Sequence, residues 1–219
     1  MLSGVIMMNN FINVFQNNKN FLLTALVEHI QISYISVLMG SLIAVPAGIA
    51  LTRNIKIGKK VLAATGVLQT IPSMVMFGVL IPFTGIGKLT AMIVLTLYSI
   101  LPILRNTYTG ISEVPDYCVE AATGMGMSSL QILFRVELPL ALPVIVTGIR
   151  LASVYIVSWA TVAALIGGGG LGDIIHTGLA RYNHAMLMLG VIPSCLLAIS
   201  TSFIIGQIAK AVTPAGLKR

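Results

Sequence analysis

Two glycine-rich segments have residue types that could bind phosphate. Residues 167–172 have the G-x-G-x-x-G spacing of a dinucleotide-binding loop, but no predicted strand precedes them. The acidic residue of that motif should follow about twenty residues later, whereas Asp173 follows immediately. Residues 85–88 resemble the end of a phosphate-binding loop, but Pro82 stands at its first glycine and Leu89 at its Ser or Thr position. We therefore expect neither segment to bind a nucleotide.

The sequence also gives no support for covalent catalysis or for a metal site. His29, His176 and His184 lack the spacing of metal ligands, and no Ser/His/Asp arrangement is recognisable. The two cysteines, Cys118 and Cys195, have no metal-like spacing and are not expected to form a disulfide. We expect no catalytic residue, no metal site and no cofactor on this chain, and histidines that lie in solvent or at the interface.

The composition excludes a water-soluble globular protein. Of the 219 residues, 57% are hydrophobic and 9% are charged, and the mean hydropathy is +0.98. An average soluble domain has about a quarter of its residues charged. The net charge of +7, from 13 basic and 6 acidic residues, could suggest nucleic acid binding. In a membrane protein the same excess reflects basic residues held on the cytoplasmic face, so nucleic acid is not an expected partner.

Long stretches without charge alternate with short basic segments. Roughly 20 apolar residues cross the hydrocarbon layer as a helix, and a helix satisfies every backbone polar group there. Lys88 and Arg105 bound a shorter stretch and can extend outward from it. We therefore predict an all-α integral membrane protein with about five transmembrane helices, at residues 30–52, 62–82, 88–106, 139–166 and 185–209.

The distribution of basic residues predicts the orientation. Nine of the 13 share one side if the spans alternate, namely Arg53, Lys56, Lys59, Lys60, Arg105, Arg135, Lys210, Lys218 and Arg219. Since cytoplasmic segments carry the excess of Lys and Arg, the N-terminus should lie outside and the C-terminus in the cytoplasm. Residues 1–29 would then be an extracellular segment with a lead-in helix, residues 30–212 the transmembrane domain and residues 213–219 a cytoplasmic tail.

One segment, residues 107–138, holds four of the six acidic residues and is the only sizeable cytoplasmic loop in this topology. We expect two short helices in it, at 114–123 and 128–137, with a turn at Gly124 and Gly126 and with Pro139 interrupting the path into the next span. Ser128 and Gln131 fit a capping box. The loop is apolar enough to dock a partner, and the alternative is that it folds back under its own bundle.

The residues of this loop resemble the EAA loop of bacterial ABC importer permeases. That pattern has Glu-Ala-Ala, a glycine and Ile-x-Leu-Pro, and the matching residues here are Glu120, Ala121, Ala122, Gly126, Val136, Leu138 and Pro139. Val136 replaces the usual isoleucine, which is a mild departure. Small alanines would let the helix lie in a groove of an ATP-binding subunit, and the Leu-Pro pair would join the loop to the following span.

The resemblance covers nearly all of residues 25–212, including segments 68–82, 97–111, 136–152 and 167–175, and is to the short permeases of osmoprotectant importers. It implies a type I importer in the bacterial plasma membrane that carries glycine betaine, carnitine or choline. Implied partners are ATP-binding subunits that hold ATP and Mg, a second permease (a paralogue or an identical copy), an extracellular substrate-binding protein and membrane lipid. Another solute, such as an amino acid or ergothioneine, is an alternative, and a membrane anchor or assembly protein is a distant one.

Several residues in the spans have further candidate roles. Tyr98, Tyr155 and Trp159 could line a translocation path, although aromatic residues in spans commonly serve packing. Arg150 is costly in a bilayer, and we expect it to tie its span to the loop by pairing with Glu137, Glu120 or a carbonyl freed by Pro143, rather than to contact solute.

Two groups of glycines also have candidate roles. A glycine run at the outer end of the fourth predicted span is a candidate outer gate or contact for the binding protein, and the alternative is a flexible turn. The run comprises Gly167, Gly168, Gly169, Gly170 and Gly172, with Asp173. Gly40, Ala44 and Gly48 repeat every four residues, which favours close contact between helices of one bundle.

Overall fold

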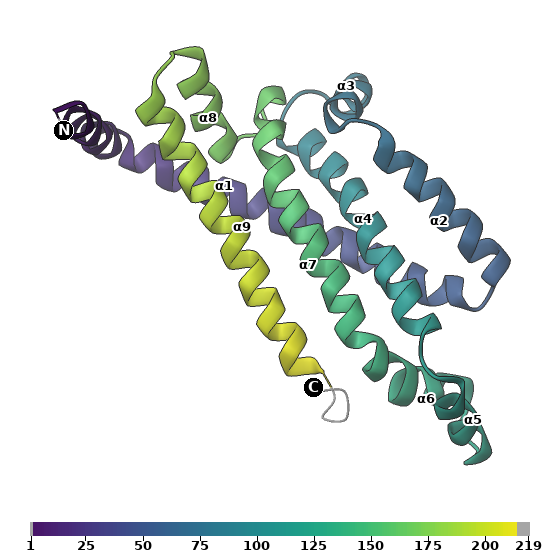
Figure 1. The fold of residues 1–219 in the computed structure, drawn as a ribbon. Helices are drawn as coiled ribbons and strands as arrows, with labels where there is room; N and C mark the ends of the chain where they lie inside the picture. Colours follow the sequence, from purple (N-terminus) through teal and green to yellow (C-terminus); the bar gives the residue numbers. More distant parts are fainter. Residues whose placement is uncertain (1, 214–219) are drawn as a thin grey trace.

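The computed structural model describes residues 2–213, with side chains from residue 11 onward, and the described residues form helices joined by short turns (Figure 1). The elements are α1 (Leu2–Thr52), α2 (Ile55–Thr70), α3 (Ser73–Thr84), α4 (Lys88–Ser112), α5 (Asp116–Gly124), α6 (Ser129–Ile132), the π-helical turn η1 (Leu133–Glu137), α7 (Leu138–Ala163), the 3₁₀ turn η2 (Ala164–Ile166), α8 (Leu171–Ala180) and α9 (His184–Val212). The predicted tail, apart from Thr213, lies outside the described residues.

The described residues contain four or five candidate membrane-spanning helices, compared with about five predicted. Four helical stretches within these residues are long and apolar enough to cross a bilayer, at Phe11–Thr52, Lys88–Ser112, Ser129–Ile166 and His184–Val212. The bent pair of α2 and α3 makes a fifth crossing if it is counted as one broken span. The prediction of an all-α integral membrane fold is therefore confirmed, while the side on which each terminus lies stays a prediction.

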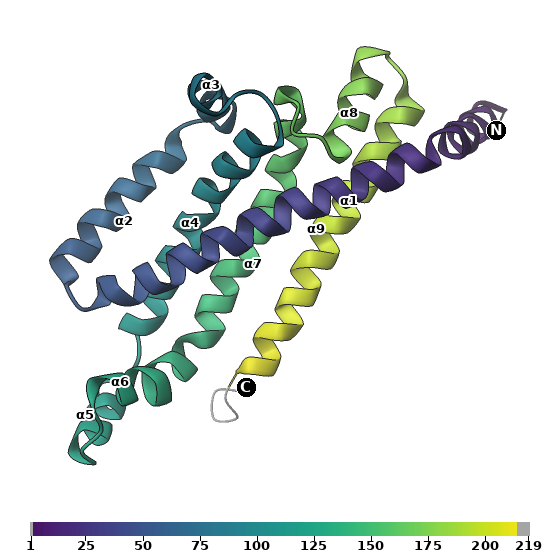
Figure 2. The same ribbon diagram turned by 180° about the vertical axis from the view of Figure 1, so that it is seen from behind.

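The first helix differs from the expected division at residue 30. α1 runs through that position without a break for 51 residues, so the predicted lead-in helix and first span are one helix. No glycine or proline occurs between Gly4 and Gly40, and the polar residues 9–20 include no helix breaker. Figure 2 shows α1 crossing the bundle diagonally, so this helix contacts α4, α7 and α9 in turn.

The predicted span at residues 62–82 is two helices rather than one. α2 ends at Thr70 and α3 begins at Ser73, with a bend of 94° between them. Proline disfavours helical geometry in the residue before it, and Ile71, which precedes Pro72, has an extended ψ of 124°. The Tyr98 hydroxyl donates a 2.5 Å hydrogen bond to the Ile71 carbonyl oxygen, which stabilises the break with a partner from α4.

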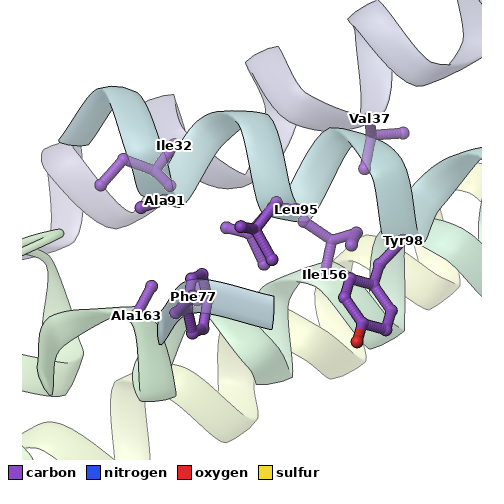
Figure 3. Close-up of a cluster of buried hydrophobic side chains, with 10 residues drawn as sticks. Ile32, Val37, Phe77, Ala91, Leu95, Tyr98, Ile156 and Ala163 are labelled. Atoms are coloured by element: carbon purple, nitrogen blue, oxygen red, sulfur yellow. The ribbon is translucent and has the colours of Figure 1, made fainter. Parts of the chain in front are cut away.

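The core lies where α1, α3, α4 and α7 meet. Its side chains include Ile32 from α1, Phe77 from α3, Leu95 and Tyr98 from α4 and Ile156 from α7, all at most 5% exposed (Figure 3). Phe77 belongs to this cluster, and Met76 and Leu80 of the same helix pack against it, so these side chains attach the short helix α3 to the bundle.

Glycines allow the long helices to touch along their backbones. An added Cβ at Gly48 would lie 2.7 Å from the Thr107 Cβ, and one at Gly40 would collide with the Ser99 hydroxyl. The small-residue stripe of α1 therefore packs against α4 within this chain, as its spacing predicted. Gly148 serves the same purpose between α7 and α4.

This packing predicts opposite effects for two glycine-to-alanine exchanges. Gly148→Ala would place a Cβ 2.5 Å from the Asn106 Cβ and 3.0 Å from the Pro102 carbonyl oxygen, and we expect a loss of about 1–3 kcal/mol from overpacking. Gly78→Ala, in α3 with no atom within 4 Å, should leave stability unchanged or raise it. Thermal unfolding of the purified protein in detergent measures both, and a matching loss for the two variants would contradict the close α4–α7 contact.

Candidate functional site

The loop that carries the acidic residues forms a separate helical unit at one end of the bundle. Pro115 precedes α5, and α6 with η1 leads into α7. α5 and α6 project from the end of the bundle opposite to α3 and α8 (Figures 1 and 2). The two predicted short helices are both present, but the second is a single α-helical turn followed by a π-helical turn.

A glycine turn and a capping box give this unit its shape. Gly126 has a φ of +77°, which favours glycine, while Gly124 is the last residue of α5 with ordinary helical geometry. The Ser128 N–H donates to the Gln131 Oε1 at 2.8 Å, and the Gln131 N–H donates to the Ser128 Oγ at 3.4 Å. The predicted capping box is thus confirmed, and of the two predicted turn glycines only Gly126 needs positive φ.

Apolar side chains cover the outside of the unit. Tyr117, Met125, Leu130 and Phe134 are each between 63% and 74% exposed. Ala122 is buried within the unit, whereas Glu120 and Ala121 are exposed. Large apolar side chains that gather on a protruding element mark an interaction surface, and we call these four residues the coupling surface. Within the part of the chain whose side chains are described, no segment covers this surface by folding back over it.

The path from the loop into α7 is helical from Ser129 onward, but a π-helical turn disturbs it just before Pro139, in line with the prediction that the helix would not run on undisturbed. The Leu138 N–H bonds to the Leu133 carbonyl oxygen, five residues earlier, which is the π-helical pattern. Pro139 follows in the first turn of α7, and the chain stays helical although Pro139 has no N–H to donate. Val136 and Leu138 are half-buried on this path, and α6, η1 and α7 form one continuous element.

Glu137 joins this element to the end of α1. Its carboxylate accepts hydrogen bonds from both terminal nitrogens of Arg53, at 3.1 Å and 2.5 Å. Glu137 is buried, while the Arg53 side chain is 52% exposed. Hydrogen bonding to the Glu137 carboxylate raises the pKa of the Arg53 guanidinium above its usual range, so Arg53 stays charged. Sequence reasoning missed this pair, because the partners are 84 positions apart.

The expected pairing of Arg150 with the loop is wrong. Its guanidinium donates through Nε and one terminal nitrogen to the Ser202 Oγ of α9, at 3.0 Å and 2.8 Å. Glu137 is occupied by Arg53, and Arg150 forms no ion pair with an acidic residue in the described chain. Arg150 therefore connects α7 to α9 and not to the loop.

The three aromatic candidates for the path do lie together. The Tyr98 and Trp159 rings meet edge to face with centroids 4.8 Å apart, and the Tyr155 and Trp159 rings are stacked at 5.9 Å. Tyr98 is buried and also borders a cavity of about 320 Å³ between α2, α3 and α4, whereas Tyr155 is 46% exposed. Together they form a row of rings from the core to the exposed face of α7.

The glycine run is a packing junction rather than a free surface. Gly168, Gly169, Gly170 and Gly172 are buried, and only Gly167 is exposed. A Cβ at Gly172 would collide with the Thr161 carbonyl oxygen, and one at Gly170 would lie 3.0 Å from the His29 ring. The proposed contact with a binding protein would therefore have to involve neighbouring side chains and not these glycines.

Residues of α1 complete this junction. The Glu28 carboxylate accepts hydrogen bonds from the Gly170 N–H at 3.3 Å and from the Lys88 Nζ at 2.6 Å. His29 is 1% exposed and its Nε2 lies 3.0 Å from the Val157 carbonyl oxygen, so the expectation of a solvent-exposed histidine is wrong here. Burial, and then the nearby charge of Glu28, raise the pKa of the Asp173 carboxyl above its usual range.

The described residues contain no group of three or more His, Cys, Asp or Glu side chains placed to hold a metal. The loop instead presents exposed apolar side chains on a unit that continues through α6 and η1 into α7.

Residues 36–215 match the family described as the binding-protein-dependent transport system inner membrane component. The chain belongs to this family. It is 42% identical to the choline transport system permease protein OpuBB of Bacillus subtilis, over 97% of this chain and 98% of that protein. It is 41% identical to the carnitine transport permease protein OpuCB of Listeria monocytogenes, over 96% and 97% of the two chains.

Solved structures agree with this assignment. The inward-facing MetNI methionine ABC transporter superposes with a TM-score of 0.81 at 26% identity, over 88% of this chain and 96% of that one. The chain is thus a multi-pass permease subunit in the bacterial plasma membrane and not an enzyme, as predicted. Membership of the family implies an ATPase, a substrate-binding protein and a second permease as partners.

The Arg53–Glu137 pair predicts an asymmetry between its two single variants. Arg53→Met leaves the buried Glu137 carboxylate without its partner, and we expect a loss of about 1–3 kcal/mol. Glu137→Gln leaves a guanidinium that is half exposed to water, so its loss should be smaller. Thermal unfolding of the purified protein measures both, and the double variant should resemble Glu137→Gln. Equal losses for the two single variants would show that the buried carboxylate is not the costly partner.

Proposed function

We propose that this chain is the membrane subunit of an ATP-driven importer of quaternary ammonium osmoprotectants such as glycine betaine, carnitine and choline. The observation that carries the proposal is the identity of 41–42% to a choline and a carnitine permease over nearly the full length of each chain. A third relative, 42% identical, is the glycine betaine/carnitine/choline permease protein OpuCB of Bacillus subtilis.

The coupling surface on α5, α6 and η1 is proposed to bind the ATP-binding subunits on the cytoplasmic side. ATP and Mg are held there, on the partner, and closure of the ATPases moves the loop. Because η1 and α7 are continuous, a displacement of α5 and α6 tilts α7, which changes the side on which the path opens. In this orientation the N-terminus is outside, and the glycine junction with Asp173 lies at the outer end near the docked binding protein.

Tyr98, Trp159 and Tyr155 are proposed to contribute to the translocation path. Quaternary ammonium groups are recognised by aromatic faces, and the exposed ring of Tyr155 is the member of the row that solute can reach. Solute would pass between this chain and the second permease, which is a paralogue or an identical copy.

Two other functions are kept as alternatives. An amino acid or ergothioneine is a possible solute, because the solved methionine transporter shares this fold, but the identity to it is lower, at 26%. A membrane anchor or assembly protein would not need the continuous helical connection from α6 through η1 to the membrane-spanning helix α7. Co-purification with an ATP-binding subunit argues against the anchor.

The coupling role predicts different results for the same exchange at two neighbouring glycines. Gly126→Val forces a β-branched residue to a φ of +77°, which costs about 1–2 kcal/mol and distorts the turn. Gly124→Val, in ordinary helical geometry with open space around it, is the matched control. In the reconstituted complex we expect uptake to fall roughly 10-fold for Gly126→Val and to remain near wild type for Gly124→Val, with both chains inserted in the membrane. Full uptake by Gly126→Val would count heavily against the coupling role.

The solute class is tested by competition. Proteoliposomes that hold the complete complex take up labelled glycine betaine, and unlabelled carnitine and choline should each reduce this uptake. Methionine and ergothioneine at the same concentration should leave it unchanged. Competition by either of these two, without competition by carnitine or choline, would replace the osmoprotectant with the alternative solute.

A further inference from the structure

The turn from α1 into α2 gathers positive charge at one end of the bundle. Four basic residues occur within eight positions, at Arg53, Lys56, Lys59 and Lys60, and all four are exposed. Arg53 is bonded to Glu137, so this turn lies beside the start of α7, at the end of the bundle that carries α5 and α6 (Figure 1). The three lysines have no part in that bond.

The chain supplies no counter-charge for these lysines. The sequence has no Asp or Glu between Glu28 and Glu113, and the two ion pairs among the described residues are Arg53–Glu137 and Lys88–Glu28. α2 also has no acidic residue in its first turn, where the helix dipole favours negative side chains and disfavours positive ones. The lysines therefore repel one another at an unfavourable end of the helix, and an anion from outside the chain would relieve both effects.

The lysines share one face of α2, directed away from the bundle. Gly58 is buried, and a Cβ added there would lie 2.6 Å from the Tyr108 ring of α4 and 2.9 Å from the Leu51 carbonyl oxygen of α1. This close contact identifies the side of α2 that packs on the bundle. At 3.6 residues per turn, the three lysines project roughly 100–200° around the helix axis from Gly58. Their ammonium groups therefore lie on the outward side.

Apolar residues continue the same face along α2. Ala63 and Val67 follow the lysines on the outward side and are both exposed, Val67 by 66%. α2 lies at the edge of the bundle in both views (Figures 1 and 2) and forms the broken span together with α3. A face that is basic at its start and apolar beyond it matches the boundary between headgroups and hydrocarbon, where lysine extends its ammonium group toward the headgroups.

The continuation of this face distinguishes lipid from protein as the partner. An acidic protein segment would satisfy the ammonium groups but would leave the apolar residues beyond them uncovered. An anionic lipid presents a phosphate and then acyl chains, in the same order along the membrane normal as the two parts of the face. Clusters of basic residues next to a membrane-spanning helix are typical of binding to anionic headgroups. The pattern of α2 therefore favours an anionic lipid.

We propose that Lys56, Lys59 and Lys60 bind the phosphate groups of anionic lipids in the leaflet beside α5 and α6, with the acyl chains along Ala63 and Val67. Phosphate oxygens accept charge-assisted hydrogen bonds from the ammonium groups. Lys56 and Lys60 are one turn apart, so both can reach the same phosphate. The bound lipid holds the start of α2 at the depth of the headgroups. This inference goes beyond the proposed function and does not depend on which solute is carried.

The test compares how tightly the full-length chain, purified in a neutral detergent, binds phosphatidylglycerol and phosphatidylcholine with the same acyl chains. Native mass spectrometry counts the bound lipids in each titration. A lysine next to an anionic lipid surface contributes about 5-fold in affinity, so the wild type should bind phosphatidylglycerol at least about 10-fold more tightly than phosphatidylcholine. Lys56→Gln combined with Lys60→Gln should lower the phosphatidylglycerol affinity about 10-fold or more, and leave phosphatidylcholine binding unchanged.

A matched control removes the same charge from other places. Lys19→Gln combined with Lys210→Gln changes exposed lysines of α1 and of the last turn of α9, and this variant should keep the preference for phosphatidylglycerol. Lys56→Arg combined with Lys60→Arg retains both charges and should also keep it. Added salt should weaken the preference in the wild type, because exposed charges are screened.

Several results would overturn the proposal. These are equal affinity of the wild type for the two lipids, an unchanged preference after Lys56→Gln with Lys60→Gln, and an equal loss in the matched control, which would trace the preference to net charge. Inorganic phosphate or glycerol 3-phosphate should not displace phosphatidylglycerol, and displacement by either would assign the lysines to a soluble phosphate. If the glutamine variant keeps its lipid preference but no longer co-purifies with an ATP-binding subunit, the partner of this face is a protein.

The single exchange Lys59→Gln decides the question if the double variant does not insert in the membrane. It should lower the affinity for phosphatidylglycerol about 5-fold, with no change for phosphatidylcholine. An unchanged affinity for both lipids would count against the proposed site.

Discussion

A polar group in the hydrocarbon layer has no water to bond, and the form of this protein follows from that constraint. The long helices satisfy their backbone internally, and their breaks are supplied with side-chain partners. The Ile71 carbonyl, freed where α2 ends before Pro72, accepts from the Tyr98 hydroxyl. His29 in the same way joins α1 to the Val157 carbonyl of α7. Such bonds between helices hold α3 and the C-terminal half of α7 in position, so the aromatic row beside them has a fixed geometry.

Local patterns in the sequence predicted the local structure well. Uncharged stretches predicted the spans, and Ser128 with Gln131 predicted a cap that the structure contains, because these signals depend on neighbouring residues. The effect of Pro72 was also local, and the sharp bend could have been predicted from it. The partners of charged residues could not be predicted, because they come from distant segments. Arg53 and Glu137 are 84 positions apart and Arg150 and Ser202 are 52 apart, and nothing in the sequence distinguishes Ser202 from other serines.

The glycine run shows that the same residue type can indicate two different structures. A flexible turn favours glycine because of its backbone freedom, and a tight packing junction favours glycine because it has no side chain. At Gly172 a Cβ would collide with the Thr161 carbonyl, and the Gly170 N–H bonds to the Glu28 carboxylate, so this run is a junction. It fastens η2 and α8 to α1, and Lys88 extends the connection to the start of α4. The end of the bundle near α8 is therefore held by packing, by hydrogen bonds and by one ion pair.

The end of the bundle that carries α5 and α6 is held differently, and this difference bears on how force would travel. On the proposed function, the ATPase moves α5 and α6, and the π-helical turn passes this motion to α7 without a flexible joint. Because Glu137 is bonded to Arg53, the end of α1 moves with the start of α7. α1 and α7 both pack on α4 through glycine contacts, so the three helices resist separation and would tilt together. Arg150, at the middle of α7 and bonded to Ser202, lies where such a tilt changes the contact with α9.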